Sequence, residues 1–247
     1  STGNYLFVAD RDNNAVRRLN LSGNVTETFV TTGDHKPVAL AIDAQDNVYV
    51  LNQGTGSNGT LQKFNKYKNL LGTLAGGLVN ATAVALDGSA NVYLTVQGNT
   101  VLRINAVSTN IVGVITNAGT FLRGIAVLNN GQIALSDSGR HGIWLLNPDT
   151  GVKTALTGFN PAGDEFGTPA FARFNQPWQI AKAGGDLLVV VDRGNHRVKL
   201  VDLSSGIVLP FYGVSPADWV AGWPWPGWYD GQACDHGYGN CAEAREP

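Results

Sequence analysis

Five segments of this chain share one pattern: an apolar strand, a polar turn, a second apolar strand that closes on Asn or Asp, another turn, and a third strand. The closing residues recur after 45, 40, 42 and 55 positions, and they are Asn20, Asn65, Asn105, Asn147 and Asp202. Asn and Asp suit a tight turn because their side chains bond nearby backbone groups and tolerate left-handed dihedrals. The chain therefore contains a repeat, with an insertion near its end.

A further apolar strand precedes each of the last four segments, and these strands read PVALAID, ATAVALD, LRGIAVL and PWQIAKA. Four strands per repeat, and no helical periodicity of useful length, predict an all-β fold. The expected architecture is a β-propeller of four-stranded antiparallel blades, with five blades visible. We expect residues 1–247 to form a single propeller domain.

The two ends of the chain bear on how the ring closes. The N-terminal stretch NYLFVAD matches the second strand of a blade, and the C-terminal AREP aligns with the stretch FNQP that precedes an inner strand. We therefore expect an excerpt of a longer polypeptide whose ring can include a sixth blade. The alternative is a five-bladed ring with one three-stranded blade, which leaves an inner strand edge unpaired.

Three segments resemble the NHL repeat, in which a strand ending in Asp leads through a turn into a basic and apolar strand. They are VVVDRGNHRVKLVD, FVADRDNNAVRRLN and ALSDSGRHGIWLLN, and FGTPAFARFNQP resembles the connector before an NHL blade. Asn52 and Val96 stand where the other repeats have Asp. The resemblance implies the fold and leaves the function open, since NHL propellers include enzymes, binding modules and structural parts.

The histidines are expected on one face of the propeller. His141 and His196 occupy the same place in adjacent repeats, where the first repeat has Asn14, and His35 and His236 lie in connectors. A metal site at this face is one interpretation. The other is that the repeated polar residues bond the backbone of their own turns and tie one blade to the next.

Repeat-position carboxylates accompany these histidines at Asp10, Asp137 and Asp192. NHL-like amidating lyases hold zinc through histidines, but the inner strands of this chain contain none. Asp43 and Asp87, which a calcium-dependent propeller hydrolase could use, have the setting of turn residues. We therefore expect no catalytic residues, no metal site and no cofactor.

A segment rich in Trp, Pro and Gly spans residues 214–241. Its aromatic residues either pack onto the propeller or form a platform for a protein partner or sugar rings; the predicted partner-binding set is Trp219, Trp223, Trp225, Trp228 and Tyr229. Cys234 and Cys241 lie in the same segment, and we expect them to form a disulfide.

The net charge and the glycosylation sequons bear on the binding partners and the cellular location. A net charge of −2 without a basic run argues against nucleic acid, and no apolar stretch is long enough to cross a membrane. Four glycosylation sequons begin at Asn20, Asn24, Asn58 and Asn80, although this Asn, Ser and Thr content produces several by chance.

These features favour a non-catalytic extracellular or cell-surface module. Its expected role is that of a protein-interaction or structural module in a larger secreted or surface assembly, with other proteins of the assembly, or glycans, as its partners. The alternative is a metal-dependent propeller enzyme, similar to an amidating lyase or a lactonase, with its site on the histidine-bearing face.

Overall fold

The computed structural model describes residues 5–89, 91–159 and 161–212, which form five antiparallel sheets. Blade 1 has three strands: β1 (Tyr5–Asp10), β2 (Ala15–Asn20) and β3 (Val25–Thr31). Blade 2 contains β4 (Pro37–Ile42), β5 (Val48–Asn52), β6 (Gly59–Phe64) and β7 (Leu70–Leu78). Blade 3 contains β8 (Ala83–Leu86), β9 (Asn91–Val96), β10 (Thr100–Asn105) and β11 (Ile111–Ile115). Blade 4 contains β12 (Leu122–Val127), β13 (Ile133–Asp137), β14 (Gly142–Leu146) and β15 (Lys153–Gly158). Blade 5 contains β16 (Pro177–Lys182), β17 (Leu187–Asp192), β18 (Arg197–Asp202) and β19 (Val208–Tyr212).

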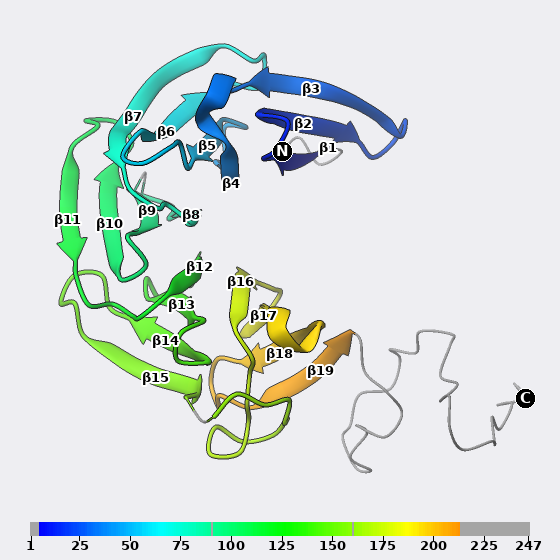
Figure 1. The fold of residues 1–247 in the computed structure, drawn as a ribbon, viewed down its shortest axis with the longest axis vertical. Coiled ribbons are helices and arrows are strands. Elements are labelled where there is room, and N and C mark those ends of the chain that lie inside the picture. The colour runs from blue at the N-terminus through cyan, green and yellow to red at the C-terminus, as the bar shows by residue number, and fades with distance from the viewer. Residues whose placement is uncertain (1–4, 90, 160, 213–247) are drawn as a thin grey trace, which may run out of the picture.

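The five blades fan around one axis, as the sequence repeat predicts (Figure 1). The described strands nearest the axis contact one another in chain order: β1 of blade 1 contacts β4, and the inner strands β4, β8, β12 and β16 follow. Blade 1 and blade 5 stand at the two ends of the arc. The chain is thus a β-propeller.

Within the described residues, blade 1 has no counterpart of the inner strand of the other blades, as the N-terminal sequence predicts. Its β1 corresponds to the second strand of a blade, and among the described strands it pairs with β2 alone. The long spacing between the fourth and fifth repeats arises from the connector between β15 and β16, which spans residues 159–176.

Neighbouring blades pack face to face through apolar side chains. On β9, Val92 and Leu94 belong to the core between blades 2 and 3, whereas Tyr93 belongs to the core between blades 3 and 4. All three side chains are buried, because successive residues of a strand point to opposite faces of its sheet. A blade in the middle of the arc is therefore apolar on both faces, which explains its nearly continuous hydrophobic strands.

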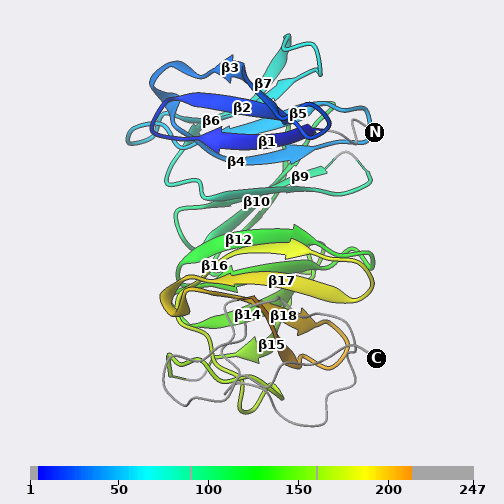
Figure 2. The ribbon, with the colours of Figure 1, turned by 90° about the vertical axis from the view of Figure 1, so that its right-hand side faces the viewer.

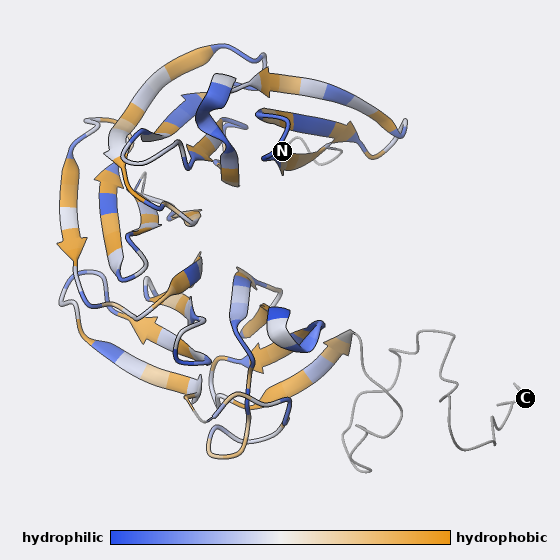
Figure 3. Cartoon of the chain, in the orientation of Figure 1, coloured by the Kyte–Doolittle hydropathy of each residue, from blue (hydrophilic) through white to orange (hydrophobic). Residues whose placement is uncertain are grey.

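Hydrophilic residues concentrate in the turns and in β2 (Figure 3). Two of the turns form short 3-10 helices, η1 (Gly33–His35) and η2 (Arg193–Asn195). Within the described part of the chain, no helix has the length and apolar character that a membrane span requires.

The strand ends define two faces of the propeller, and the inner strands run between them, across the view of Figure 2. One face carries the connectors between blades and the turn between the second and third strands of each blade. We call it the connector face. The other carries the remaining turns of each blade, and we call it the opposite face.

Candidate functional site

The predicted histidines lie on the connector face, so their placement on one side is confirmed for the three that the structure describes. His35 ends η1 in a connector, and His141 and His196 lie in second-to-third-strand turns. His236 lies outside the described residues. Among the described residues, no three His, Cys, Asp or Glu side chains come together in a group that could hold a metal ion.

Asp137 shows what the repeat-position carboxylate does. Its Oδ2 accepts hydrogen bonds from the backbone N–H of Thr120 at 2.9 Å and from Trp144 Nε1 at 3.2 Å. Its Oδ1 accepts the backbone N–H of Phe121 at 3.1 Å and of Gly139 at 3.2 Å. The buried carboxylate thus joins its own turn to the connector that enters the blade, at residues 120 and 121.

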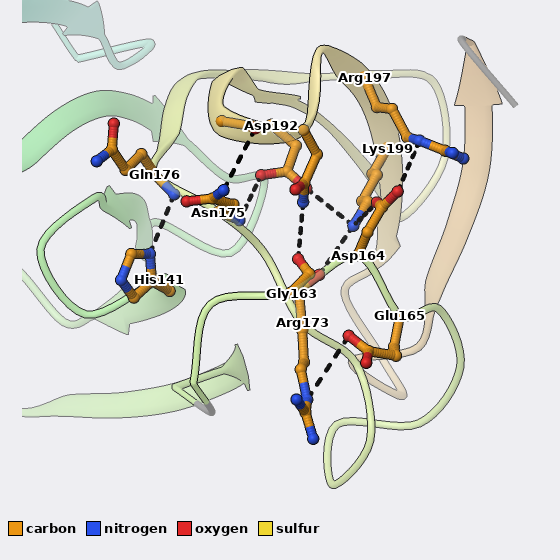
Figure 4. A network of polar contacts seen from close by, with 12 residues as sticks. His141, Gly163, Asp164, Glu165, Arg173, Asn175, Gln176, Asp192, Arg197 and Lys199 are labelled. Atoms are coloured by element: carbon orange, nitrogen blue, oxygen red, sulfur yellow. Dashed lines mark hydrogen bonds and ion pairs between the residues drawn. The ribbon is translucent and has the colours of Figure 1, made fainter.

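His141 ties blade 4 to blade 5. Its Nδ1 accepts the backbone N–H of Gln176 at 3.1 Å, one residue before β16 begins (Figure 4). Neutral imidazole with an acceptor at Nδ1 carries its proton on Nε2. In the first repeat the Oδ1 of Asn14 accepts the N–H of Lys36 at 3.2 Å, again one residue before an inner strand. This equivalence confirms the structural interpretation of the repeat position for Asn14 and His141.

The backbone explains why these residue types recur. Asn14, His141 and His196 have φ values of 50°, 57° and 54°, in the left-handed region. Asn and His are enriched there relative to bulky or β-branched residues. The backbone N–H of His196 donates to the carbonyl of Arg193 at 3.2 Å and closes η2.

Asp192 anchors a buried ionic cluster in blade 5, which Figure 4 shows from close by. Its Oδ1 accepts the N–H of Asn175 at 2.7 Å, and its Oδ2 accepts a hydrogen bond from Asn195 Nδ2 at 2.7 Å. The Nζ of Lys199 lies 2.8 Å from Asp192 Oδ2, and both side chains have 0% exposure. The Nζ also donates to the carbonyl of Arg173 at 2.8 Å.

Asp164, from the long connector, completes the cluster. Its Oδ1 lies 2.9 Å from the Nζ of Lys199, and its Oδ2 lies 2.7 Å from Arg197 Nε. Phe166 and Phe174 enclose the ammonium, with ring centroids 4.9 and 5.1 Å from Nζ. The cluster therefore fixes residues 163–175 against blade 5.

Two blades replace the carboxylate. The amide of Asn52 donates to Thr60 Oγ1 at 3.1 Å and to Gln62 Oε1 at 3.0 Å, so it bonds within its own blade. In blade 3, where Val96 is apolar, Thr82 and Thr95 share a hydrogen bond of 2.7 Å between their hydroxyl oxygens. These substitutions preserve the blade without a charge at the repeat position.

On the opposite face, the prediction that Asp43 and Asp87 are turn residues is confirmed. Asp43 Oδ1 accepts the N–H groups of Gln45 and Asn47, and Asp87 Oδ1 accepts the equivalent pair in blade 3. Burial raises the pKa of both carboxyls, but hydrogen bonds outweigh it, above all those from Asn47 and Asn91, and hold each pKa below its usual value.

A cavity of about 530 Å³ lies along the axis between the inner strands. All five blades line it, mostly with aliphatic side chains such as Val38, Val84 and Ile125; Gln179 and Lys182 are its polar members. This lining offers an apolar surface, and its described residues include none of the inward-facing carboxylates that a calcium-dependent hydrolase needs.

The remaining predicted site residues divide into two groups. Asn24, Asn58 and Asn80 are exposed, and Asn20 is half-buried, with its Oδ1 accepting the N–H of Ser22 at 2.9 Å. Residues 214–241, including the aromatic partner-binding set and both cysteines, lie outside the described residues.

The sequence reasoning missed the ionic cluster. A lysine at the center of the apolar strand sequence RVKLVD was the available signal, because a buried lysine needs a partner. Its partner Asp164 lies 35 positions earlier in an irregular connector, and no local pattern links the two.

Comparison of the sequence with known proteins gives a partial match and no family. No family model matches the chain. Over 98 residues it is 33% identical to Protein SUPPRESSOR OF QUENCHING 1, chloroplastic, of Arabidopsis thaliana, a match that covers 38% of this chain and 9% of that protein. The matched stretch is thus a small part of its curated relative.

Solved structures resemble a larger share of the chain. An auxiliary nutrient binding protein from Bacteroides thetaiotaomicron has a TM-score of 0.69 at 16% identity, covering 87% of this chain and 55% of that one. A catalytically inactive virginiamycin B lyase from Staphylococcus aureus, solved with quinupristin, gives 0.62 at 13% identity and coverages of 84% and 66%. A chain of a nidogen/laminin complex gives 0.58 at 16% identity and coverages of 81% and 89%. At these identities the likeness establishes the propeller fold alone, and the chain spans about half the length of the first of these structures.

Proposed function

We propose that this propeller is a non-catalytic module that binds other proteins in a secreted or cell-surface assembly. One observation carries the proposal: the repeat-position Asp137, His141 and Asp192 are committed to holding turns and connectors. A catalytic acid, base or metal ligand needs a free lone pair or proton directed at a substrate. These side chains instead make the blades rigid with respect to one another.

A rigid disc suits protein recognition because little conformational freedom is lost on binding. The likeness to a chain from a nidogen/laminin complex and to a nutrient binding protein agrees with a binding role. The recurring arrangement of the turns, with Asp at the strand end and a left-handed Asn or His behind it, supports kinship with NHL propellers.

The first experiment measures bound metal and turnover on the purified protein. We expect zinc and calcium far below one equivalent, and the same low content in His141→Gln and His196→Gln. One equivalent of metal that either substitution removes, together with hydrolysis of a lactone or amidated peptide, would instead establish the metal-dependent enzyme.

The second experiment addresses binding directly. Photo-reactive residues are placed in the native full-length protein at His35 on the connector face and at Gln45 on the opposite face. We expect one protein to cross-link repeatedly from one face, and to bind the purified propeller in a reconstituted mixture. Equal labelling of unrelated proteins from both faces, with no reconstituted complex, would contradict the proposal.

The proposed secreted location is tested by measuring the mass of the native protein before and after removal of N-linked glycans. If the protein passes through a glycosylating secretory pathway, an N-glycosidase should lower the mass of the native protein, and Asn24→Gln or Asn80→Gln should each remove part of that difference. An unglycosylated protein retained inside the cell would refute the secreted setting while leaving the binding role to the cross-linking experiment.

A further inference from the structure

Two arginine side chains lie against the ring of one tryptophan at the connector end of the inner strands of blades 4 and 5. Arg123 is the second residue of β12, Trp178 is the second residue of β16, and Arg193 begins η2. The guanidinium carbons of Arg123 and Arg193 lie 4.5 and 4.7 Å from the centroid of the Trp178 ring. Because both distances are measured to the same ring centroid, the two guanidinium carbons lie no more than about 9 Å apart.

Close strand packing brings these side chains together. A Cβ added to Gly124 would lie 2.7 Å from both the carbonyl oxygen of Trp178 and the amide nitrogen of Ile180. Only a glycine at this position allows β12 and β16 to approach so closely. Ser136, on the next strand of blade 4, donates its hydroxyl hydrogen to the carbonyl of Trp178 and fixes the backbone that carries the indole.

The charge of this pair is not neutralised within the described part of the chain. Most other arginines there form ion pairs with carboxylates, namely Arg11 with Asp12, Arg17 with Asp10, Arg18 with Glu27, Arg103 with Asp149, Arg173 with Glu165 and Arg197 with Asp164. Arg140 forms none there, but its Nε donates to Thr120 Oγ1 at 3.0 Å. Arg123 and Arg193 form no such pair there. The nearby carboxylate of Asp192 is occupied by Lys199.

Arg123 also has unused hydrogen-bonding capacity. Its Nε is buried and has no hydrogen-bond partner within the described structure. Leaving a buried donor without a partner costs about 1–3 kcal/mol, and more when the group is charged. Burial, and then the neighboring charge of Arg193, lower the pKa of Arg123 below its ordinary value. Both effects disfavour this arrangement in the absence of an anion.

We propose that Arg123 and Arg193 form a binding site for an oxyanion, a carboxylate or phosphate group, at the connector end of β12 and β16. A guanidinium presents its N–H groups as a rigid fork that matches the two oxygens of such an anion. Trp178 provides a flat apolar wall that holds both forks in place. Gln176 steadies the outer arginine, since its Oε1 accepts a hydrogen bond from Arg193 Nη1 at 3.5 Å.

The site is independent of the proposed protein-binding role. It would serve equally for a small ligand or for an acidic group of a larger one, so its success or failure leaves the cross-linking experiment unaffected.

The test titrates the purified protein with inorganic phosphate and, separately, with succinate, using calorimetry and the arginine side-chain Nε–H signals in NMR. We expect saturable binding of at least one probe, a shift of the Arg123 Nε–H signal, and a loss of affinity of about tenfold or more in Arg193→Gln, as expected when a charge-assisted contact is removed. Binding of phosphate alone assigns a phosphate ligand, and binding of succinate alone assigns a carboxylate.

Two further variants make the result decisive. Arg193 is exposed, so Arg193→Gln should fold even if Arg123→Gln does not; Arg193→Lys keeps the charge but loses the fork, and should bind with intermediate affinity. Arg11→Gln is the matched control, because it removes one charge from the same face at a residue already paired with Asp12. Absence of binding by both probes, or an equal loss in Arg11→Gln, would overturn the proposal.

Discussion

Lys199→Met tests whether the buried ionic cluster holds the long connector in place. The substitution removes the ammonium from a site where Lys199 and Asp192 both have 0% exposure, and methionine fills most of the same volume. Asp192 is then left as a buried carboxylate without its cation, and the carbonyl of Arg173 loses its 2.8 Å donor. Removing one partner of a buried ion pair costs about 3–5 kcal/mol.

That loss is large on the scale of domain stability, which is about 5–15 kcal/mol. With a urea dependence of about 1–3 kcal/mol per molar, the midpoint should fall by at least about 1 M. Limited proteolysis should also cleave the connector within residues 159–176 faster than in the unsubstituted protein, because Asp164 loses the contact that draws it to blade 5.

The double variant Lys199→Met with Asp192→Asn separates the ion pair from general packing. It removes the uncompensated charge, so it should cost clearly less than the two single substitutions added together. Lys182→Met is the control: Lys182 is an exposed lysine in the same blade, and its loss should stay within about 0.5 kcal/mol. A Lys199→Met variant that loses less than about 1 kcal/mol, or additive single effects, would refute the reasoning.

Three further predictions concern single positions. Gly124→Ala should destabilise the protein by about 1–3 kcal/mol, because the added methyl group overpacks β12 against β16. Asp137→Ala should cost at least the ~1–3 kcal/mol of one buried donor left unpaired, since it removes the acceptor for three backbone N–H groups and an indole. Burial raises the pKa of Tyr93 to about 12, so the folded state favours the neutral phenol; stability should be retained up to about pH 10 and lost as the pH rises toward 12. Tyr93→Phe should remove this part of the alkaline loss.

Each of these three predictions has a control variant or a reference protein whose stability is measured by the same urea unfolding. Gly88→Ala adds a methyl group where no atom lies within 4 Å, and should leave stability unchanged; equal losses at Gly88 and Gly124 would argue against close strand approach. Asp12→Ala removes an exposed carboxylate with 87% side-chain exposure, and a loss as large as that of Asp137→Ala would show that charge rather than backbone bonding matters. Identical alkaline profiles for the natural protein and Tyr93→Phe would contradict the role given to the phenol.

Local pattern was sufficient to predict the propeller and the turns. Each blade buries its strands on one or both faces, so the alternation of apolar strand and polar turn recurs with the blade. The turn roles of Asp43, Asp87, Asn14 and His141 could be predicted for the same reason. A side chain that bonds the backbone within a few residues, or at an equivalent place in every repeat, leaves its mark in the local sequence.

The tertiary structure alone decided which polar groups from distant segments meet. Lys199 forms an ion pair with Asp164, which lies in an irregular connector 35 positions earlier. Arg123 and Arg193 contact the same ring of Trp178 because Gly124 allows β12 and β16 to lie close together. Such pairings depend on how blades pack and on how a long loop folds back, and neither has a sequence period. The sequence by itself determined a repeated blade and its turns, because those are set by interactions between near neighbours. The ionic cluster and the arginine pair were decided by packing between elements far apart in the chain, where burial turns individually ordinary charges into a specific arrangement.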